Sequence, residues 1–139
     1  MASWKTTTDR ARGHRGFTLI EVMVVMAIIV ILAGVGVALY ANSVTRSKEA
    51  VLKEDLFRMR DAIDQYYADR NEYPASLEAL VAEKYMRNVP VDPFTSSRDT
   101  WQLTMSEPDP TNPAGDPGVF DVKSGSELTA IDGTLYADW

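Results

Sequence analysis

The chain lacks cysteine and has a single histidine among its 139 residues. Without cysteine it has no disulfide framework, no thiolate nucleophile and no zinc site built on sulfur. The histidine, His14, lies in a basic N-terminal segment, which excludes a Ser/His/Asp triad from the rest of the chain. There is also no phosphate-cradling glycine loop and no pair of carboxylates at a catalytic spacing. The sequence therefore predicts a protein that is not an enzyme.

Positive charge is scarce after the first 16 residues. Residues 1–16 hold four basic side chains and one acidic side chain, namely Lys5, Arg10, Arg12, Arg15 and Asp9. Subtracting this +3 from the formal total of −6 leaves −9 for residues 17–139. Binding to nucleic acid depends on Lys and Arg contacts to phosphate, so an acidic exterior argues against it.

A long uncharged run extends from Val22 to Asn42. Together with the preceding turn it is long enough, at about 1.5 Å per helical residue, to span a hydrocarbon core of about 30 Å. The basic leader favours a cytoplasmic N-terminus. A secretory signal peptide is the alternative, although its apolar core is usually about 7–15 residues and Ala41–Ser43 is a poor cleavage site. The run predicts one membrane-spanning helix.

Glu21 places a carboxylate at the start of this apolar run. An acidic residue at the centre of a membrane helix costs about 2.5–3.5 kcal/mol on insertion scales, and less near an end. Glu21 either reaches water at the interface or pairs with an amine. If the chain is cut between Gly16 and Phe17, the new α-amino group lies four residues before Glu21, on the same helical face. Pairing of this kind between chains would make Glu21 a register mark for assembly.

The stretch "RGFTLIEVMVV", which follows a basic leader and begins an apolar helix, resembles the N-terminus of type IV pilins and type II secretion pseudopilins. The resemblance implies that residues 1–16 are a leader peptide, which a prepilin peptidase removes after Gly16. It also implies that Phe17 is N-methylated. Glu21 would then be the fifth residue of the mature chain and would guide subunits into a helical filament.

One feature of the apolar segment departs from this family. Its members commonly carry a proline in the second half of the segment, where this chain has Gly34 and Gly36. The glycines either make the helix flexible, each weakening it by up to about 1 kcal/mol relative to alanine, or let helices pack closely. Both explanations remain open.

A second apolar pattern continues the helix beyond the membrane segment. Its members recur at steps of four, three, four and three, and are Leu52, Leu56, Met59, Ile63 and Tyr66. This spacing predicts an amphipathic helix that ends before Pro74, because proline disfavours helix at the residue before it. We expect one helix of about 50 residues, with 17–42 as the transmembrane and filament-core part. Residues 43–139 would form the head domain, which includes the amphipathic half of the helix.

The head itself predicts a short helix and a small antiparallel sheet. Ser76 is placed as the N-cap of the helix. Residues 101–105 and 119–122 are prone to form strands, and the Pro-rich and Gly-rich residues 106–118 would join them as a surface loop. The expected fold is α+β and pilin-like: a long N-terminal helix packed on a small head.

The segments "EYP", "LEALV", "VPVDPF", "GVFDVKSGS" and "ADW" resemble the major, G-type pseudopilin of type II secretion systems. The family's frequent Asp-Pro-Trp-Gly turn is replaced here by Asp92–Thr95. The resemblance implies a structural subunit that polymerises through its N-terminal helix into a pseudopilus and drives protein secretion. Its partners would be other copies of itself, the prepilin peptidase, an inner-membrane assembly platform, minor pseudopilins and, before assembly, membrane lipid.

The same resemblance implies that the head lies in the periplasm and the helix in the bacterial inner membrane. The alternative is a major subunit of a type IV pilus that serves adhesion, motility or DNA uptake. Many type IV pilins close their C-terminal region with a disulfide, so the lack of cysteine favours the pseudopilin.

Family members of this type bind calcium in the C-terminal loop. Calcium prefers six to eight oxygen ligands, including carboxylates. Oxygen-bearing side chains near the end of the chain include Ser124, Ser126, Glu127, Asp132 and Asp138. We take Glu127, Asp132 and Asp138 as the candidate calcium ligands, although no EF-hand spacing is present and ordinary solvated turns explain the same residues.

Overall fold

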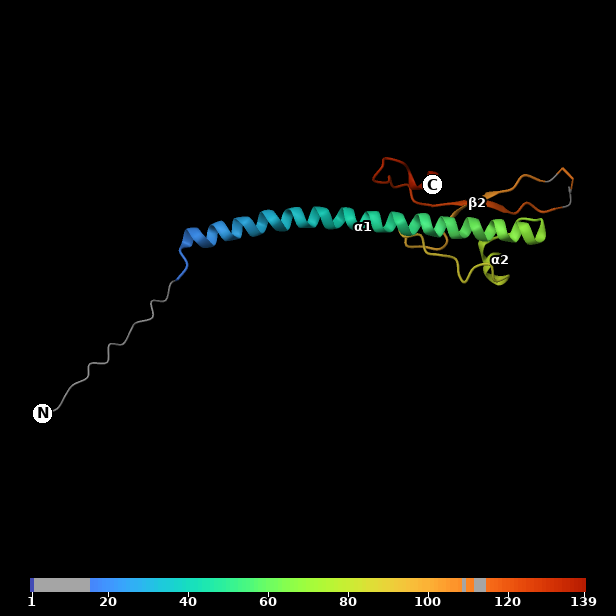
Figure 1. Cartoon of the computed structure of the whole chain (residues 1–139). Coiled ribbons are helices and arrows are strands. Elements are labelled where there is room, and N and C mark those ends of the chain that lie inside the picture. Colours follow the sequence, from blue (N-terminus) through green and yellow to red (C-terminus); the bar gives the residue numbers. More distant parts are fainter. Residues whose placement is uncertain (2–15, 109, 112–114) are drawn as a thin grey trace. The chain divides into compact units, whose positions relative to one another are not determined.

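A computed structural model describes residues 1, 16–108, 110, 111 and 115–139. The chain divides into two compact units, Met1–Leu39 and Tyr40–Trp139. In chain order the elements are α1 (Leu19–Arg70), α2 (Leu77–Ala82), β1 (Gln102–Met105), β2 (Val119–Lys123) and the 3-10 helix η1 (Tyr136–Asp138) (Figure 1). This order of helices and strands confirms the predicted α+β, pilin-like fold.

Helix α1 has 52 residues and includes both the apolar run and the amphipathic pattern, as predicted. It is long and apolar enough to cross a membrane by length and composition. Residues 22–42 are exposed all round, whereas the amphipathic part buries one face. That face consists of Leu52, Leu56, Met59, Ala62, Ile63 and Tyr66. The predicted periodicity is therefore confirmed.

The end of α1 and the start of α2 follow the local sequence. After Arg70, Asn71 adopts a left-handed conformation with φ of 57°, and its N–H donates to the carbonyl of Tyr67 at 2.7 Å. Asparagine tolerates this conformation better than most residues, so it ends the helix at low cost. Ser76 caps α2 as predicted, because its side chain accepts a hydrogen bond from the N–H of Ala79 at 3.3 Å.

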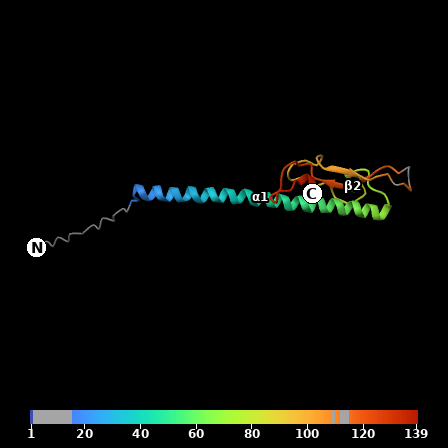
Figure 2. The same cartoon turned by 90° about the horizontal axis from the view of Figure 1, so that it is seen from above.

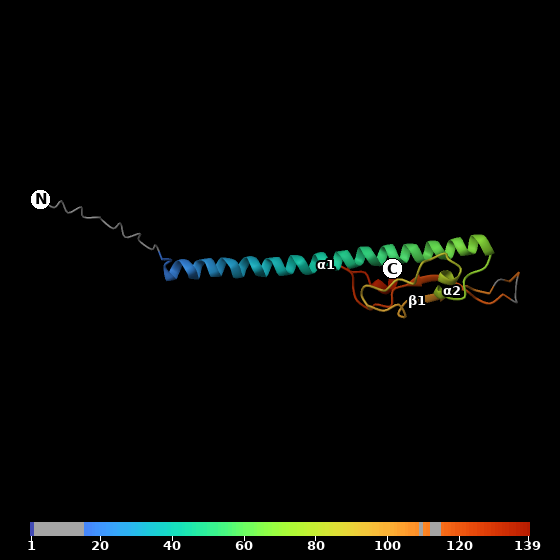
Figure 3. The same ribbon diagram turned by 90° about the horizontal axis from the view of Figure 1, so that it is seen from below.

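Strands β1 and β2 pair antiparallel, with Gln102 opposite Lys123 and Leu103 opposite Val122. The register shifts between Thr104 and Met105, which indicates a β-bulge. All four residues of β1 are exposed, so this strand buries neither face. Strand β2 buries Val119 and Val122, which are three residues apart, so its burial does not follow a strict alternation. Figures 2 and 3, seen from above and below, show both strands beside the second half of α1.

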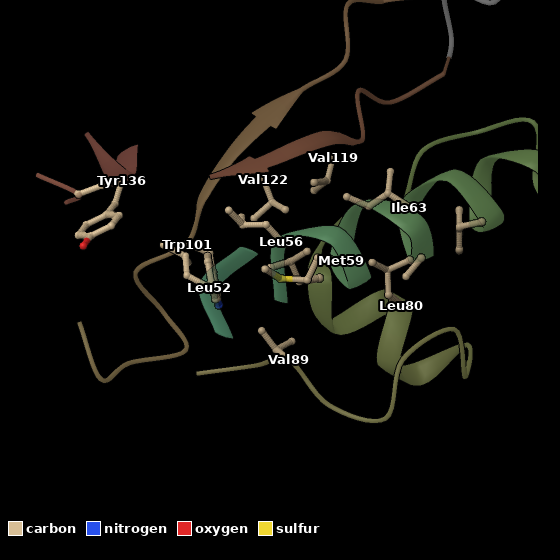
Figure 4. Packing of buried hydrophobic residues seen from close by; sticks show 14 residues of the cluster. Leu52, Leu56, Met59, Ile63, Leu80, Val89, Trp101, Val119, Val122 and Tyr136 are labelled. Carbon is tan, nitrogen blue, oxygen red and sulfur yellow. The ribbon is translucent and has the colours of Figure 1, made fainter. Parts of the chain in front are cut away.

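The core lies between the second half of α1, β2 and α2. Figure 4 shows Leu56 near Val122 and Ile63 near Val119. Met59 belongs to the same cluster, and Leu80 of α2 lies at one side. Trp101, just before β1, is also buried, and its indole N–H donates to the carbonyl of Pro90 at 2.8 Å. Burying a large aliphatic side chain contributes about 1.5–3 kcal/mol, so this cluster is the main source of stability in residues 40–139.

Candidate functional site

The N-terminal end of α1 is capped by Thr18. Its Oγ1 accepts a hydrogen bond from the N–H of Glu21 at 3.3 Å, and its carbonyl accepts one from Val22 at 3.1 Å. Thr18 and Glu21 have the spacing of a capping box, in which a threonine N-cap precedes glutamate by three residues. Thr18 was not predicted as the cap, although this spacing was the signal for it.

The predicted cleavage point lies just outside the helix. Gly16, Phe17 and Thr18 have no regular secondary structure, and α1 begins at Leu19. Gly16 is exposed, and the side chain of Phe17 is 79% exposed. Exposed and irregular backbone is the kind that proteases cleave most readily. The geometry is thus compatible with cutting between Gly16 and Phe17, which stays a prediction.

Glu21 lies in the first turn of α1 and shares a shallow groove with Phe17. The groove has a volume of about 210 Å³ and is otherwise lined by Val22, Val25, Met26 and Ile29. Phe17 and Glu21 thus line the same groove, although Phe17 precedes the helix, so the spacing of four does not place the two residues on one helical face here. A carboxylate in the first turn also interacts favourably with the positive end of the helix dipole. The predicted ion pair needs a free amine at Phe17 and remains a prediction.

The two glycines of the apolar segment make no close approach within the described chain. A Cβ added at Gly34 or at Gly36 meets no atom within 4 Å. The fold of one chain alone therefore does not require glycine at either position. Helix flexibility and packing between chains both remain open as their role.

The oxygen-bearing residues near the end of the chain have other partners. Asp132 Oδ1 accepts hydrogen bonds from the N–H of Thr134 at 3.0 Å and from its hydroxyl at 2.6 Å. These bonds hold the pKa of Asp132 below its usual range. Ser124 donates to the buried Asp92, and Ser126 Oγ accepts from the N–H of Leu128 at 3.3 Å.

The candidate calcium ligands do not fit a metal site. Glu127, Asp132 and Asp138 are each exposed. Among the described residues, no three Asp, Glu, His or Cys side chains come together in a way that would hold a metal ion. In the described part of the chain, every buried side-chain nitrogen or oxygen has a hydrogen-bond partner, so none is left for a cation to satisfy. In the structure the three carboxylates are separate and Asp132 already binds Thr134, so they do not converge on one position.

Residues 92–95 replace the family's tryptophan-containing turn. Asp92 is fully buried, and its Oδ1 accepts from the N–H groups of Phe94 at 2.9 Å and Thr95 at 3.3 Å. The ring of Phe94 stacks on that of Tyr136, with centroids 3.9 Å apart. The left-handed residue of the turn is Ser96, with φ of 55°. An aromatic side chain and a tight turn are thus present without tryptophan or glycine.

Comparisons with known proteins agree with the N-terminal features. Residues 11–37 match the family model described as the prokaryotic N-terminal methylation motif. The type II secretion system core protein G of Pseudomonas aeruginosa is 35% identical over 99 residues, which cover 60% of this chain and 70% of that protein. The core protein G of Vibrio cholerae is 31% identical over 100 residues, covering 61% and 68%.

A fimbrial protein, EcpC of Eikenella corrodens, is 37% identical over 83 residues, covering 56% of this chain and 54% of that protein. No solved structure matches the chain significantly. The core protein G relatives cover more than the N-terminal motif, so the similarity extends into the head. The chain therefore belongs to the family of the type II secretion system core protein G, the major pseudopilin.

Proposed function

We propose that this chain is a structural subunit of a pseudopilus, which polymerises through its N-terminal helix to drive type II protein secretion. The observation that carries the proposal is the exposed apolar half of α1, where Glu21 is the one charged side chain between Leu19 and Asn42. An apolar surface of this length is stable only in lipid or against other chains. On polymerisation, contacts with other chains replace the contacts with lipid.

Processing would prepare this helix for assembly. The prepilin peptidase removes residues 1–16, and the new amine at Phe17 is N-methylated. Glu21 of one subunit then pairs with the Phe17 amine of a neighbour. A carboxylate in an apolar interior without a partner is expensive, so a pair of this kind favours one register over others.

The membrane-anchored subunit would wait in the bacterial inner membrane, with the head in the periplasm. Residues 17–42 form the transmembrane and filament-core part, and residues 43–139 form the head. The partners are further copies of the chain, the prepilin peptidase, the inner-membrane assembly platform and minor pseudopilins. The basic leader supports this orientation by the positive-inside tendency.

A type IV pilus subunit is the second candidate, and the similarity to the fimbrial protein EcpC favours it. The two functions differ in what is lost when the gene is deleted. A secretion subunit predicts that exported proteins accumulate in the periplasm while surface pili stay unchanged. A pilus subunit predicts the loss of pili, with secretion intact.

The proposed role of Glu21 is tested by Glu21→Ala in the full chain, expressed in its own cells. We expect normal insertion into the membrane but a loss of filaments of at least tenfold, measured by shearing and sedimentation. Glu54→Ala is the matched control, because Glu54 is an exposed residue of the same helix that pairs with Arg58. Filaments of normal yield and register from Glu21→Ala would refute the assembly role.

A further inference from the structure

The last residues of the chain are attached to one side of α1. We call residues 128–139 the C-terminal loop. The side chains of Glu49, Lys53 and Arg60 on α1 all contact it. Their spacings of four and seven residues place them on the same side of a helix with 3.6 residues per turn. We call these three residues the polar stripe of α1.

Glu49 makes the most specific contact. Its Oε1 accepts one hydrogen bond from the backbone N–H of Ile131 at 2.8 Å and another from the hydroxyl of Tyr136 at 2.8 Å. Tyr136 is 1% exposed. Burial, and to a smaller extent the hydrogen bond to Glu49, raises the pKa of Tyr136 to about 12. Hydrogen bonds to a charged acceptor are stronger than neutral ones.

Lys53 and Arg60 hold the other end of the loop. The ammonium of Lys53 lies 4.5 Å from the centre of the Trp139 ring, within the range of a cation–π interaction. Arg60 donates to the main-chain oxygens of Val122 and Trp139 and to Asp121 Oδ1 at 2.7 Å. Arg60 thereby connects β2 and the C-terminal loop to the same side of α1.

Within the loop, the aromatic and polar groups are also paired. The ring of Tyr136 packs edge-on against Trp139, with centroids 5.0 Å apart. The indole N–H of Trp139 donates to Thr134 Oγ1 at 2.7 Å, and that hydroxyl donates to Asp132. This chain of contacts takes up one of the two carboxylate oxygens of Asp132, Oδ1.

The chemistry at Glu49 is the opposite of what a cation requires. A calcium ion binds by gathering carboxylate and carbonyl oxygens around itself. Here the C-terminal loop presents an N–H and an O–H to α1, and a carboxylate of α1 receives them. The positive charges beside the loop are already supplied by Lys53 and Arg60. The contacts between the polar stripe and the loop are thus made by protein groups alone.

We propose that this chain fixes its C-terminal loop through the polar stripe of α1, with Glu49 as its principal acceptor, and that the loop therefore orders without calcium. The inference is independent of whether the filament serves secretion or a pilus. It sets this chain apart from the calcium-bound loop that the family resemblance led us to expect.

The experiment uses the full-length protein in detergent micelles. Amide hydrogen exchange of residues 128–139 and the melting temperature are measured in millimolar calcium chloride and in excess EGTA. We expect both quantities to be the same in the two conditions. A melting temperature that is higher by several degrees in calcium, with slower exchange in the C-terminal loop, would overturn the proposal.

Two variants test the polar stripe directly. Glu49→Ala should speed the exchange of the Ile131 amide at least tenfold in both conditions, whereas Glu54→Ala, on the same helix, should not change it. Tyr136→Phe removes one of the two hydrogen bonds to Glu49 with little change in side-chain volume, and it replaces Glu49→Ala as the test if that variant does not fold. In Tyr136→Phe the exchange rate of the Ile131 amide should lie between those of the wild type and Glu49→Ala. Unchanged exchange in the folded variants would contradict the role of Glu49.

Discussion

At the scale of single residues, the closest packing constraint is at Gly125, just after the end of β2. A Cβ built at this position would lie 1.9 Å from the carbonyl oxygen of Thr100. The obstacle is backbone, which has no rotamer by which to move away. The chain can therefore pass so close to Thr100 only because residue 125 has no side chain.

We predict that Gly125→Ala destabilises the head, by about 1–3 kcal/mol or more, as overpacking of a tight site does. The measurement is the urea concentration at the midpoint of unfolding, with tryptophan fluorescence as the signal. Gly36→Ala is the control, because a Cβ there meets no atom within 4 Å. An unchanged midpoint for Gly125→Ala would mean that the backbone at Thr100 relaxes without cost.

Asp92 is a second residue whose role sequence did not reveal. It is fully buried, and each of its carboxylate oxygens accepts a hydrogen bond, Oδ1 from two backbone N–H groups and Oδ2 from Ser124. In the sequence, Asp92 stands out only as part of an altered turn. Burial of a carboxylate depends on donors that are brought near it by the whole fold, and Ser124 is 32 residues away in the chain.

At the scale of elements, the sequence predicted those whose pattern is local. The apolar repeat from Leu52 to Tyr66 predicted the buried face of α1, and Pro74 predicted where the helix ends. The contact between Glu49 and Ile131 was not predicted, because 82 residues separate them and neither belongs to a recognisable motif. The candidate calcium ligands were chosen from the composition near the terminus, and composition does not tell which oxygens converge.

The contact between η1 and α1 predicts a specific dependence on alkaline pH. The pKa of Tyr136 is raised from 10.0 to about 12, chiefly by burial. Between these values the unfolded chain has lost the phenolic proton while the folded chain retains it, so the free energy of unfolding decreases as pH rises. The contribution is complete below about pH 10. We expect the melting temperature of the full chain to fall in this window, and to fall less steeply in Tyr136→Phe.

Other side chains also titrate between pH 10 and about 12. The critical quantity is therefore the slope of melting temperature against pH, compared between each variant and the wild type. Tyr85 is half-buried, and its pKa is raised mainly by its hydrogen bond to Asp69, so it acts in the same direction as Tyr136 and serves as the comparison position. Tyr85→Phe should retain most of the slope of the wild type. Identical slopes for Tyr136→Phe and the wild type would show that the phenol of Tyr136 does not contribute.

At the scale of the whole molecule, the two compact units suit different surroundings. Met1–Leu39 includes an apolar helical surface that is exposed in the single chain, whereas Tyr40–Trp139 has its own buried core. The first unit gains stability only from lipid or from other chains. The second is held together by contacts within the chain. Removal of the leader would act on the first unit and leave the core of the second unchanged.

This separation leads to a prediction for the mature protein in its native cells. We expect mass spectrometry to find an N-terminal peptide that begins at Phe17 and is heavier by one methyl group, because the Gly16–Phe17 bond precedes the capped start of α1 and residues 11–37 match the methylation motif. The leader carries +3, so its loss also removes the charge that favours a cytoplasmic N-terminus. A start near Val44 would indicate a conventional signal peptide and would exclude assembly through α1. If the leader is intact, the nitrogen of Phe17 stays in a peptide bond with Gly16. Glu21 then lacks the amine proposed as its partner.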